Sequence, residues 1–370
     1  MSTQKLSGFE IDYVEQYVPM AKTLAYWHTH ALGFTIEAYK GIENGHPGVA
    51  SYLLRSNDIR LLITSAYPSN RYQQESEILN FIRTNYAGVK RIVLKASNVW
   101  HAFEEAISKG AIPVRFPAKQ EDAFGYIEDA SIRLYDHSEL VFLNREYYDA
   151  PFLPGYKEAD SVGNTPYFLF NEIDHIASEL RMNEMPFWTG YLQNAIGTRL
   201  VQQIKRSGDN KTGMLLNINQ TPDGKLTLVM AEPESADNQS KVQQNIDNYG
   251  PGIHHLAFTT EDIVGTVKHL TRNNVEMVRF PKSYYTLLRT DPSFNNLDID
   301  ELEEHGILVD REEDAYLLQK FIKPYGDRPF FLYEVVQRIN GYNGFALSNI
   351  NLLKKAEEIE LMKLIPAKNI

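Results

Sequence analysis

Three strand-like, mostly apolar segments of the chain each contain a histidine or a glutamate. They are Ile173-Asp174-His175-Ile176, Gly252-Ile253-His254-His255-Leu256 and Leu332-Tyr333-Glu334-Val335. Two neutral imidazoles and one carboxylate form the ligand set of the ferrous facial-triad site, and the same set can also hold zinc. Such a triad leaves open metal positions that accept a chelating 2-oxo acid and O2. We therefore predict a metal site formed by His175, His255 and Glu334.

Each of these side chains also has a structural interpretation. A single histidine on a strand, such as His175, is more often a half-buried core residue than a ligand. A carboxylate inside an apolar strand is costly to bury unless it is paired or coordinated, so Glu334 needs a partner. Arg328 or Arg338 could supply that partner in place of a metal. His254 could be a pocket residue or a surface neighbour of His255.

An internal repeat favours the metal site over these alternatives. Three segments of the first half recur in the second: 10–14 as 172–176, 88–92 as 252–256, and 141–145 as 334–338. At the positions of the three candidate ligands, the first copy carries Tyr13, Arg91 and Val141. The sequence therefore predicts two copies of one module, residues 1–155 and residues 156–370. Only the second copy keeps side chains that bind a metal.

Local patterns place strands and helices around these segments. Apolar and polar alternation, with turn signals between the runs, predicts strands at 9–18, 50–54, 59–64, 88–95, 132–144, 213–219, 225–230, 315–321 and 330–337. Helical periodicity predicts helices at 20–32, 73–84, 99–109, 263–273 and 349–363. Prolines and glycines at 148–166 indicate a linker, and 291–304 reads as a solvated loop with a short helix. The chain is therefore expected to be α+β.

Composition narrows the function classes. A chain of 370 residues is long enough for two domains. Its net charge of −11 argues against a general nucleic-acid or anionic-membrane binder. No run approaches the roughly 20 apolar residues that a membrane helix needs. The chain has no cysteine, and its first residues lack the apolar segment of a secretory signal, so we expect a cytoplasmic protein.

Residues 252–258 and 331–338 resemble the 4-hydroxyphenylpyruvate dioxygenase and 4-hydroxymandelate synthase family of the vicinal-oxygen-chelate superfamily. The similarity extends through 317–321, 326–329 and 344–350, and covers nearly the whole chain. It implies two tandem βαβββ modules, the C-terminal one an open β-barrel enclosing a metal site. It also implies Fe(II) held by His175, His255 and Glu334, with O2 as co-substrate and no 2-oxoglutarate.

The resemblance further implies a substrate pocket, formed by Gln319, Phe321, Phe345, Asn349, Ile350, His254 and Ala231. Dioxygenases of the family carry Phe at the position of Ile350 and Asn at that of Ala231, so both positions favour the mandelate synthases. His254 stands where the family has Gln. Leu215 or Leu216 stands near a family Ser, Lys241 near a family Gln, and Val229 where the synthases have Thr. These losses of small polar groups leave recognition of a substrate para-hydroxyl open, since a site built to bind a hydroxyl discriminates strongly.

We therefore expect an enzyme of aromatic amino acid metabolism that converts 4-hydroxyphenylpyruvate to 4-hydroxymandelate. Homogentisate as the product, or phenylpyruvate or another 2-oxo acid as the substrate, are alternatives within the same chemistry. A zinc or nickel isomerase on the same modules, and a non-catalytic small-molecule binding protein, are alternatives from other classes. The resemblance also suggests a homo-oligomer, most simply a dimer.

Overall fold

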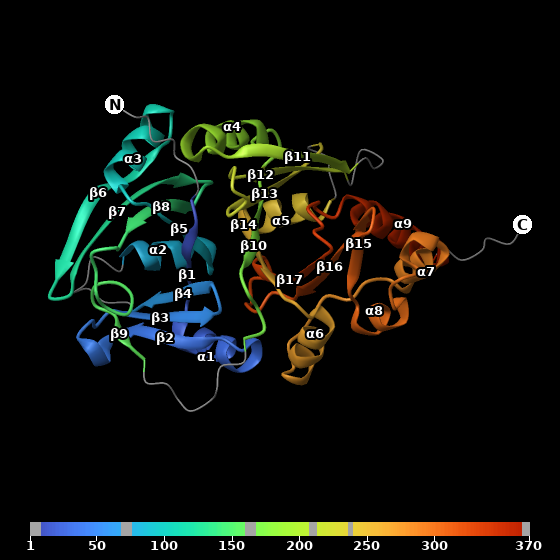
Figure 1. Ribbon diagram of the computed structural model, residues 1–370, viewed down its shortest axis with the longest axis horizontal. Coiled ribbons are helices and arrows are strands. Elements are labelled where there is room, and N and C mark those ends of the chain that lie inside the picture. Colours follow the sequence, from blue (N-terminus) through green and yellow to red (C-terminus); the bar gives the residue numbers. More distant parts are fainter. Residues whose placement is uncertain (1–8, 68–75, 160–167, 207–212, 236–239, 365–370) are drawn as a thin grey trace, which may run out of the picture. The chain divides into compact units, whose positions relative to one another are not determined.

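The computed structural model describes residues 9–67, 76–159, 168–206, 213–235 and 240–364 (Figure 1). The chain divides into two compact units, residues 1–256 with 324–331 and residues 257–323 with 332–370. Its strands form two sheets, one of nine and one of eight strands. None of the described helices is long and apolar enough to span a membrane.

The first sheet is built from two β-α-β-β-β units. Its strands, in spatial order, are β6 (Pro113–Asp122), β7 (Gly125–Leu134), β8 (Ser138–Asn144), β5 (Gly88–Lys95), β1 (Ile11–Tyr17), β4 (Ile59–Ala66), β3 (Val49–Ser56), β2 (Thr35–Lys40) and β9 (Lys157–Glu158). Strands β1 and β5 pair antiparallel at the centre, and each pairs in parallel with the last strand of its own unit. Helices α1 (Ala21–Leu32), α2 (Ser76–Asn85) and α3 (Val99–Ser108) pack against this sheet.

The second sheet repeats this order. Its strands are β11 (Arg199–Arg206), β12 (Met214–Gln220), β13 (Thr227–Pro233), β10 (Ile173–Glu179), β14 (Gly252–Thr259), β17 (Leu332–Ile339), β16 (Ala315–Ile322) and β15 (Leu308–Glu312). Starting from β2, the first sheet has the order β2-β3-β4-β1-β5-β8-β7-β6. Each of these strands corresponds to the strand at the same place in the second sheet. The second sheet curls into a half-barrel. The expected α+β class and the duplicated architecture are therefore confirmed.

Local sequence signals explain where the helices begin and end. Helix α1 ends at Gly33, whose φ of 75° is the left-handed conformation that glycine adopts most readily. Helix α3 begins at Asn98, whose side chain accepts a hydrogen bond from the amide of His101. Asp262 caps α6 (Ile263–Arg272) in the same way through the amide of Gly265. The remaining helices are α4 (Met185–Ile196), α5 (Lys241–Tyr249), α7 (Lys282–Thr290), α8 (Ile299–His305) and α9 (Leu347–Leu364), with short 3-10 turns at Ile42–Asn44 and Pro292–Phe294.

The structure differs from the sequence-based expectations at several elements. Strands β2, β6, β9, β11 and β15, and helices α5 and α7, were not predicted. Residues 132–144 form parts of two strands, β7 and β8, because the chain turns at Tyr135, where φ is 52°. The predicted helix at 73–84 is α2, and its residues 73–75 lie outside the described residues, as do 160–166 of the predicted linker.

The inner face of the first sheet is filled by an apolar cluster. It contains Tyr13 and Val141, the counterparts of His175 and Glu334, together with Val93 and other buried residues of the sheet. Phe152, from the segment after β8, completes the cluster with its ring edge-on to Tyr13 at 5.0 Å between centroids. The space that would correspond to a metal site is thus occupied by packed side chains.

Replacing Phe152 with alanine should destabilise the protein without affecting metal binding. Phe152 is 1% exposed, and truncation of a buried Phe costs about 3–5 kcal/mol of unfolding free energy. Urea unfolding of Phe152→Ala and of Phe124→Ala, whose side chain is 59% exposed, measures the difference. A loss below about 1 kcal/mol at Phe152 would contradict its role as a core residue.

Candidate metal centre

His175 lies near the start of β10 and is 7% exposed. Its Nδ1 is 2.7 Å from Oδ1 of the neighbouring Asp174. A carboxylate at one ring nitrogen fixes the tautomer of a histidine, and it also makes the other nitrogen a better metal ligand. We therefore expect Nε2 to be the coordinating atom of His175.

His255 lies on β14 and is oriented by the preceding residue. The Nδ1 atoms of His254 and His255 are 2.8 Å apart, so one ring donates to the other. The rings of His175 and His255 lie 5.5 Å apart between centroids, at 77°. His255 therefore has the same arrangement as His175, with a polar partner at Nδ1 and Nε2 as the expected ligand atom.

Glu334 lies in β17 and is 1% exposed. Its Oε1 accepts a hydrogen bond of 2.7 Å from Nε2 of Gln319 on β16. Oε1 of Gln319 in turn accepts one of 2.9 Å from Nδ2 of Asn349 on α9. Two of the predicted pocket residues, Gln319 and Asn349, thus form a chain of hydrogen bonds that ends on the carboxylate.

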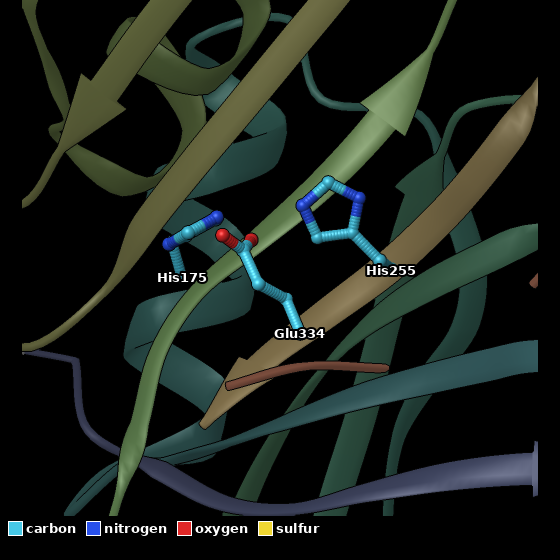
Figure 2. Close-up of side chains that lie close together, drawn as sticks. All are labelled: His175, His255 and Glu334. Carbon is cyan, nitrogen blue, oxygen red and sulfur yellow. The ribbon is translucent and has the colours of Figure 1, made fainter. Parts of the chain in front are cut away.

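One ligand atom of each of His175, His255 and Glu334 lies within 4.8 Å of those of the other two. Figure 2 shows the three side chains pointing toward one another. Metal–nitrogen and metal–oxygen bonds of roughly 2.0–2.2 Å bring such atoms within reach of one ion. The donor set of two imidazoles and a carboxylate, each with an outer hydrogen-bond partner, fits a divalent transition metal. The sequence therefore identified a group of residues that the fold brings together.

Arg328 and Arg338, which the sequence offers as ion-pair partners for Glu334, both donate hydrogen bonds to backbone carbonyls. Nη1 of Arg338 donates to the carbonyls of Tyr342 and Gly344, at 3.2 and 3.0 Å. Its guanidinium also lies 5.2 Å from the ring centre of Phe345, another predicted pocket residue. Arg328 donates to the carbonyls of Asn85 and Tyr249. These contacts show that both guanidiniums help to hold loops in place.

The other predicted pocket residues lie on three elements. Phe321 of β16 is half-buried, with its ring 6.4 Å from that of Phe280. Ala231 of β13 is buried and pairs in register with Glu179 of β10. Ile350 lies in α9, and its side chain is outside the described residues.

A buried carboxyl group near the histidines was not identified from the sequence. Glu179, on β10, is 6% exposed, and its Oε1 lies 3.1 Å from Nδ2 of Asn245 and 3.8 Å from Nε2 of His254. Its Oε2 has no hydrogen-bond partner among the described residues. Burial raises the pKa of Glu179 to about 8, so the carboxyl is mostly protonated at neutral pH. The sequence offered one signal that could have identified Glu179. This residue lies four residues after His175 along the same strand, so the two side chains lie on the same face.

Comparison with known proteins agrees with this geometry. Residues 172–299 match the model of the Glyoxalase/Bleomycin resistance protein/Dioxygenase superfamily. The chain is 30% identical over 364 residues to 4-hydroxyphenylpyruvate dioxygenase of Tetrahymena thermophila, covering 95% of this chain and 90% of that protein. It is also 30% identical over 365 residues to the enzyme of the same name from Yarrowia lipolytica, covering 95% and 92%. A solved triple mutant of 4-hydroxymandelate synthase from Streptomyces coelicolor superposes with a TM-score of 0.82 at 24% identity, covering 96% and 99%.

The fold and the ligand group define a two-module protein of the glyoxalase and dioxygenase superfamily. Within it, the chain belongs to the 4-hydroxyphenylpyruvate dioxygenase family and is a dioxygenase. The family resemblance found in the sequence is thereby confirmed. A metal cofactor follows from the ligand group and the superfamily.

The metal centre predicts one tightly bound ion per chain. Glu334→Gln should abolish stoichiometric binding, since it removes the one anionic ligand. Gln319→Leu should weaken binding by about 10- to 100-fold, because it removes only the outer partner of that ligand. Equilibrium dialysis with ferrous iron under anaerobic conditions, and with zinc, measures both effects. His101→Ala, at a surface position of α3, is the control, and unchanged affinity in Glu334→Gln would disprove the assignment.

The raised pKa of Glu179 predicts a pH-dependent stability. In the folded protein this carboxyl keeps its proton up to about pH 8, whereas the unfolded chain releases it near its ordinary pKa of 4.5. The unfolding free energy of the wild type should therefore fall relative to Glu179→Gln between these pH values, by at most about 1.4 kcal/mol per pH unit, and then level off. Urea unfolding of the metal-free protein from pH 5 to 9 measures this, with Glu121→Gln as the baseline for losing an exposed carboxylate. A constant difference across pH would show that Glu179 ionises in the folded protein as it does in the unfolded chain.

Proposed function

We propose that this chain is an Fe(II)-dependent dioxygenase that oxidatively decarboxylates 4-hydroxyphenylpyruvate, with O2 and without 2-oxoglutarate. The observation that carries the proposal is the group of His175, His255 and Glu334, with ligand atoms within 4.8 Å, in a chain whose relatives are named for this substrate. Iron bound there would hold the 2-oxo acid and supply the redox chemistry with O2.

The chain's own residues have separate tasks in this proposal. The hydrogen bond from Gln319 to Oε1 of Glu334 would orient the carboxylate and leave Oε2 available to a bound metal. Asn349 is 2% exposed, and its Oδ1 has no hydrogen-bond partner among the described residues. A buried acceptor of this kind suits a substrate hydroxyl, since leaving it unpaired costs about 1–3 kcal/mol. Phe321 and Phe345 are proposed to pack against the aromatic ring.

For the product, we propose 4-hydroxymandelate, formed by hydroxylation at the benzylic carbon. The support is Ile350, an aliphatic residue at a position where the family's dioxygenases carry Phe. A smaller side chain beside the ring allows the benzylic carbon, rather than a ring carbon, to face the oxidant. Ala231, at a position where the family's dioxygenases carry Asn, also supports 4-hydroxymandelate as the product.

Homogentisate is the second candidate product. The relatives that favour it are named 4-hydroxyphenylpyruvate dioxygenase, and two of them are 30% identical over nearly the whole chain. Both products require the same metal site and the same loss of CO2. The two candidates therefore differ only in how the pocket holds the ring.

Product analysis tests the proposal. Iron-loaded protein incubated with 4-hydroxyphenylpyruvate under O2 should release CO2 and form 4-hydroxymandelate, identified by mass and retention time. Ile350→Phe should move the product toward homogentisate, because the larger side chain displaces the ring. Phenylpyruvate, run in parallel, reports how much the para-hydroxyl contributes to kcat/KM.

Each outcome separates the alternatives. No CO2 release from either substrate would refute the aryl-pyruvate assignment. Homogentisate from the wild type would overturn the benzylic assignment while keeping the dioxygenase. Glu334→Gln is the matched inactive control, since it changes one ligand atom and little volume.

A further inference from the structure

A second cleft lies in the unit formed by residues 257–323 and 332–370. It has a volume of about 630 Å³, within the range of small-molecule sites. Its walls come from α6, the 275–282 segment, α7, the end of α8, and β16. Neighbouring side chains on a strand point to opposite faces, and Gln319 bonds to Glu334 while Lys320 lines this cleft. The cleft therefore lies on the other face of β16 from the candidate metal centre.

A buried ammonium group forms part of the cleft. Lys320 is 2% exposed, and its Nζ donates to the carbonyls of Val278, His305 and Gly306 at 2.8–2.9 Å. No carboxylate among the described residues lies within ion-pair distance of it. Burial, with a smaller effect from Arg279, lowers the pKa of Lys320 to about 8. The carbonyls at the end of α8 stabilise the cation, but no negative charge neutralises it.

Two further polar atoms of the cleft are buried without partners. Tyr285 is 1% exposed, and its hydroxyl has no hydrogen-bond partner among the described residues. The same holds for Nε2 of His305. Both residues line the cleft. Buried polar atoms are nearly always hydrogen-bonded in folded proteins, so two such atoms in one cleft point to a ligand that supplies the missing bonds.

The rest of the lining is partly apolar and partly charged, and some of its charged side chains are ion-paired. Val267, Val275, Met277 and Phe280 form the apolar part. The carboxylates of Glu303 and Glu276 are paired with Arg289 and Lys323 at 2.6 and 3.2 Å. Arg279 and Lys282, by contrast, form no ion pair within the part of the chain that the structure describes. Glu304 also lines the cleft. Outside the two ion pairs, the lining therefore holds three cationic side chains, those of Arg279, Lys282 and Lys320, and one carboxylate, so the cleft combines an apolar surface with an excess of positive charge.

We propose that this cleft is a second ligand site, separate from the metal centre, that binds a small carboxylic acid with an apolar body. The carboxylate of the ligand accepts hydrogen bonds from the Tyr285 hydroxyl and from the side chains of Arg279 and Lys282. It lies near the positive charge of Lys320. The apolar body packs against Met277 and Phe280. This assignment stands without the proposed function, because none of these side chains belongs to the candidate metal centre.

Calorimetry on metal-free protein tests this site, with phenylacetate as the probe and 2-phenylethanol as its neutral counterpart. Phenylacetate should bind once per chain, and at least about tenfold more tightly than the alcohol. His175→Ala should bind it as the wild type does. Tyr285→Phe should weaken binding by about tenfold without lowering thermal stability, because the hydroxyl it removes has no partner. Lys320→Met should weaken binding further.

Lys268→Met is the matched control, since it removes the same charge from α6 outside the cleft. Its affinity for phenylacetate should equal that of the wild type. Loss of binding in His175→Ala would place the acid at the metal centre and overturn the proposal. So would no detectable binding, equal affinity for the alcohol, or full affinity in Tyr285→Phe. None of these outcomes depends on dioxygenase activity, so the two proposals fail separately.

Discussion

The burial of the Glu334 carboxylate is the constraint on which the candidate metal centre depends. The side chain is 1% exposed in the middle of an apolar strand, where an ionised group is stable only if it is paired, hydrogen-bonded or coordinated. Gln319 satisfies one oxygen, and the two histidines bring neutral nitrogens to the same place. A divalent cation would complete this arrangement, because it would neutralise the carboxylate and take the imidazoles as ligands. Three adjacent strands of the second sheet, β10, β14 and β17, hold these three side chains together.

The first module has the same architecture, but its interior is stabilised in a different way. Its sheet has the same strand order, but Tyr13, Val141 and Phe152 form an apolar cluster where the second sheet has the candidate ligands. Arg91, the counterpart of His255, lies 2.7 Å from Glu15 and 2.9 Å from Glu77. A guanidinium thus provides the positive charge that the buried carboxylate of Glu15 needs, and no metal is required. The same strands can therefore be stabilised by packing and ion pairs or by a metal.

How far the sequence predicts this structure depends on where a strand lies in its sheet. The central strands β1, β5, β10, β14 and β17 are flanked on both sides, so their inward residues follow a regular pattern, and the ligands were found on them. Each strand that was missed, β2, β6, β9, β11 and β15, lies at or next to a sheet edge. In β6 most residues are exposed, so the alternation that marks a half-buried strand is absent. Glu334 was recognised because its neighbours are all apolar, whereas Glu179 follows Ala177 and Ser178 and drew no attention.

Glu179 changes the interpretation of His254, the residue left open by the sequence. His254 has a polar group near each ring nitrogen: Nδ1 lies at 2.8 Å from Nδ1 of His255, within hydrogen-bond distance, and Nε2 lies at 3.8 Å from Oε1 of Glu179, beyond it. A ring fixed in this way positions its neighbour, since rotation of His254 would break the contact that orients the expected ligand. Glu179 is also the register partner of Ala231 across β10 and β13, so its carboxyl brings a polar group to the strand beside that position.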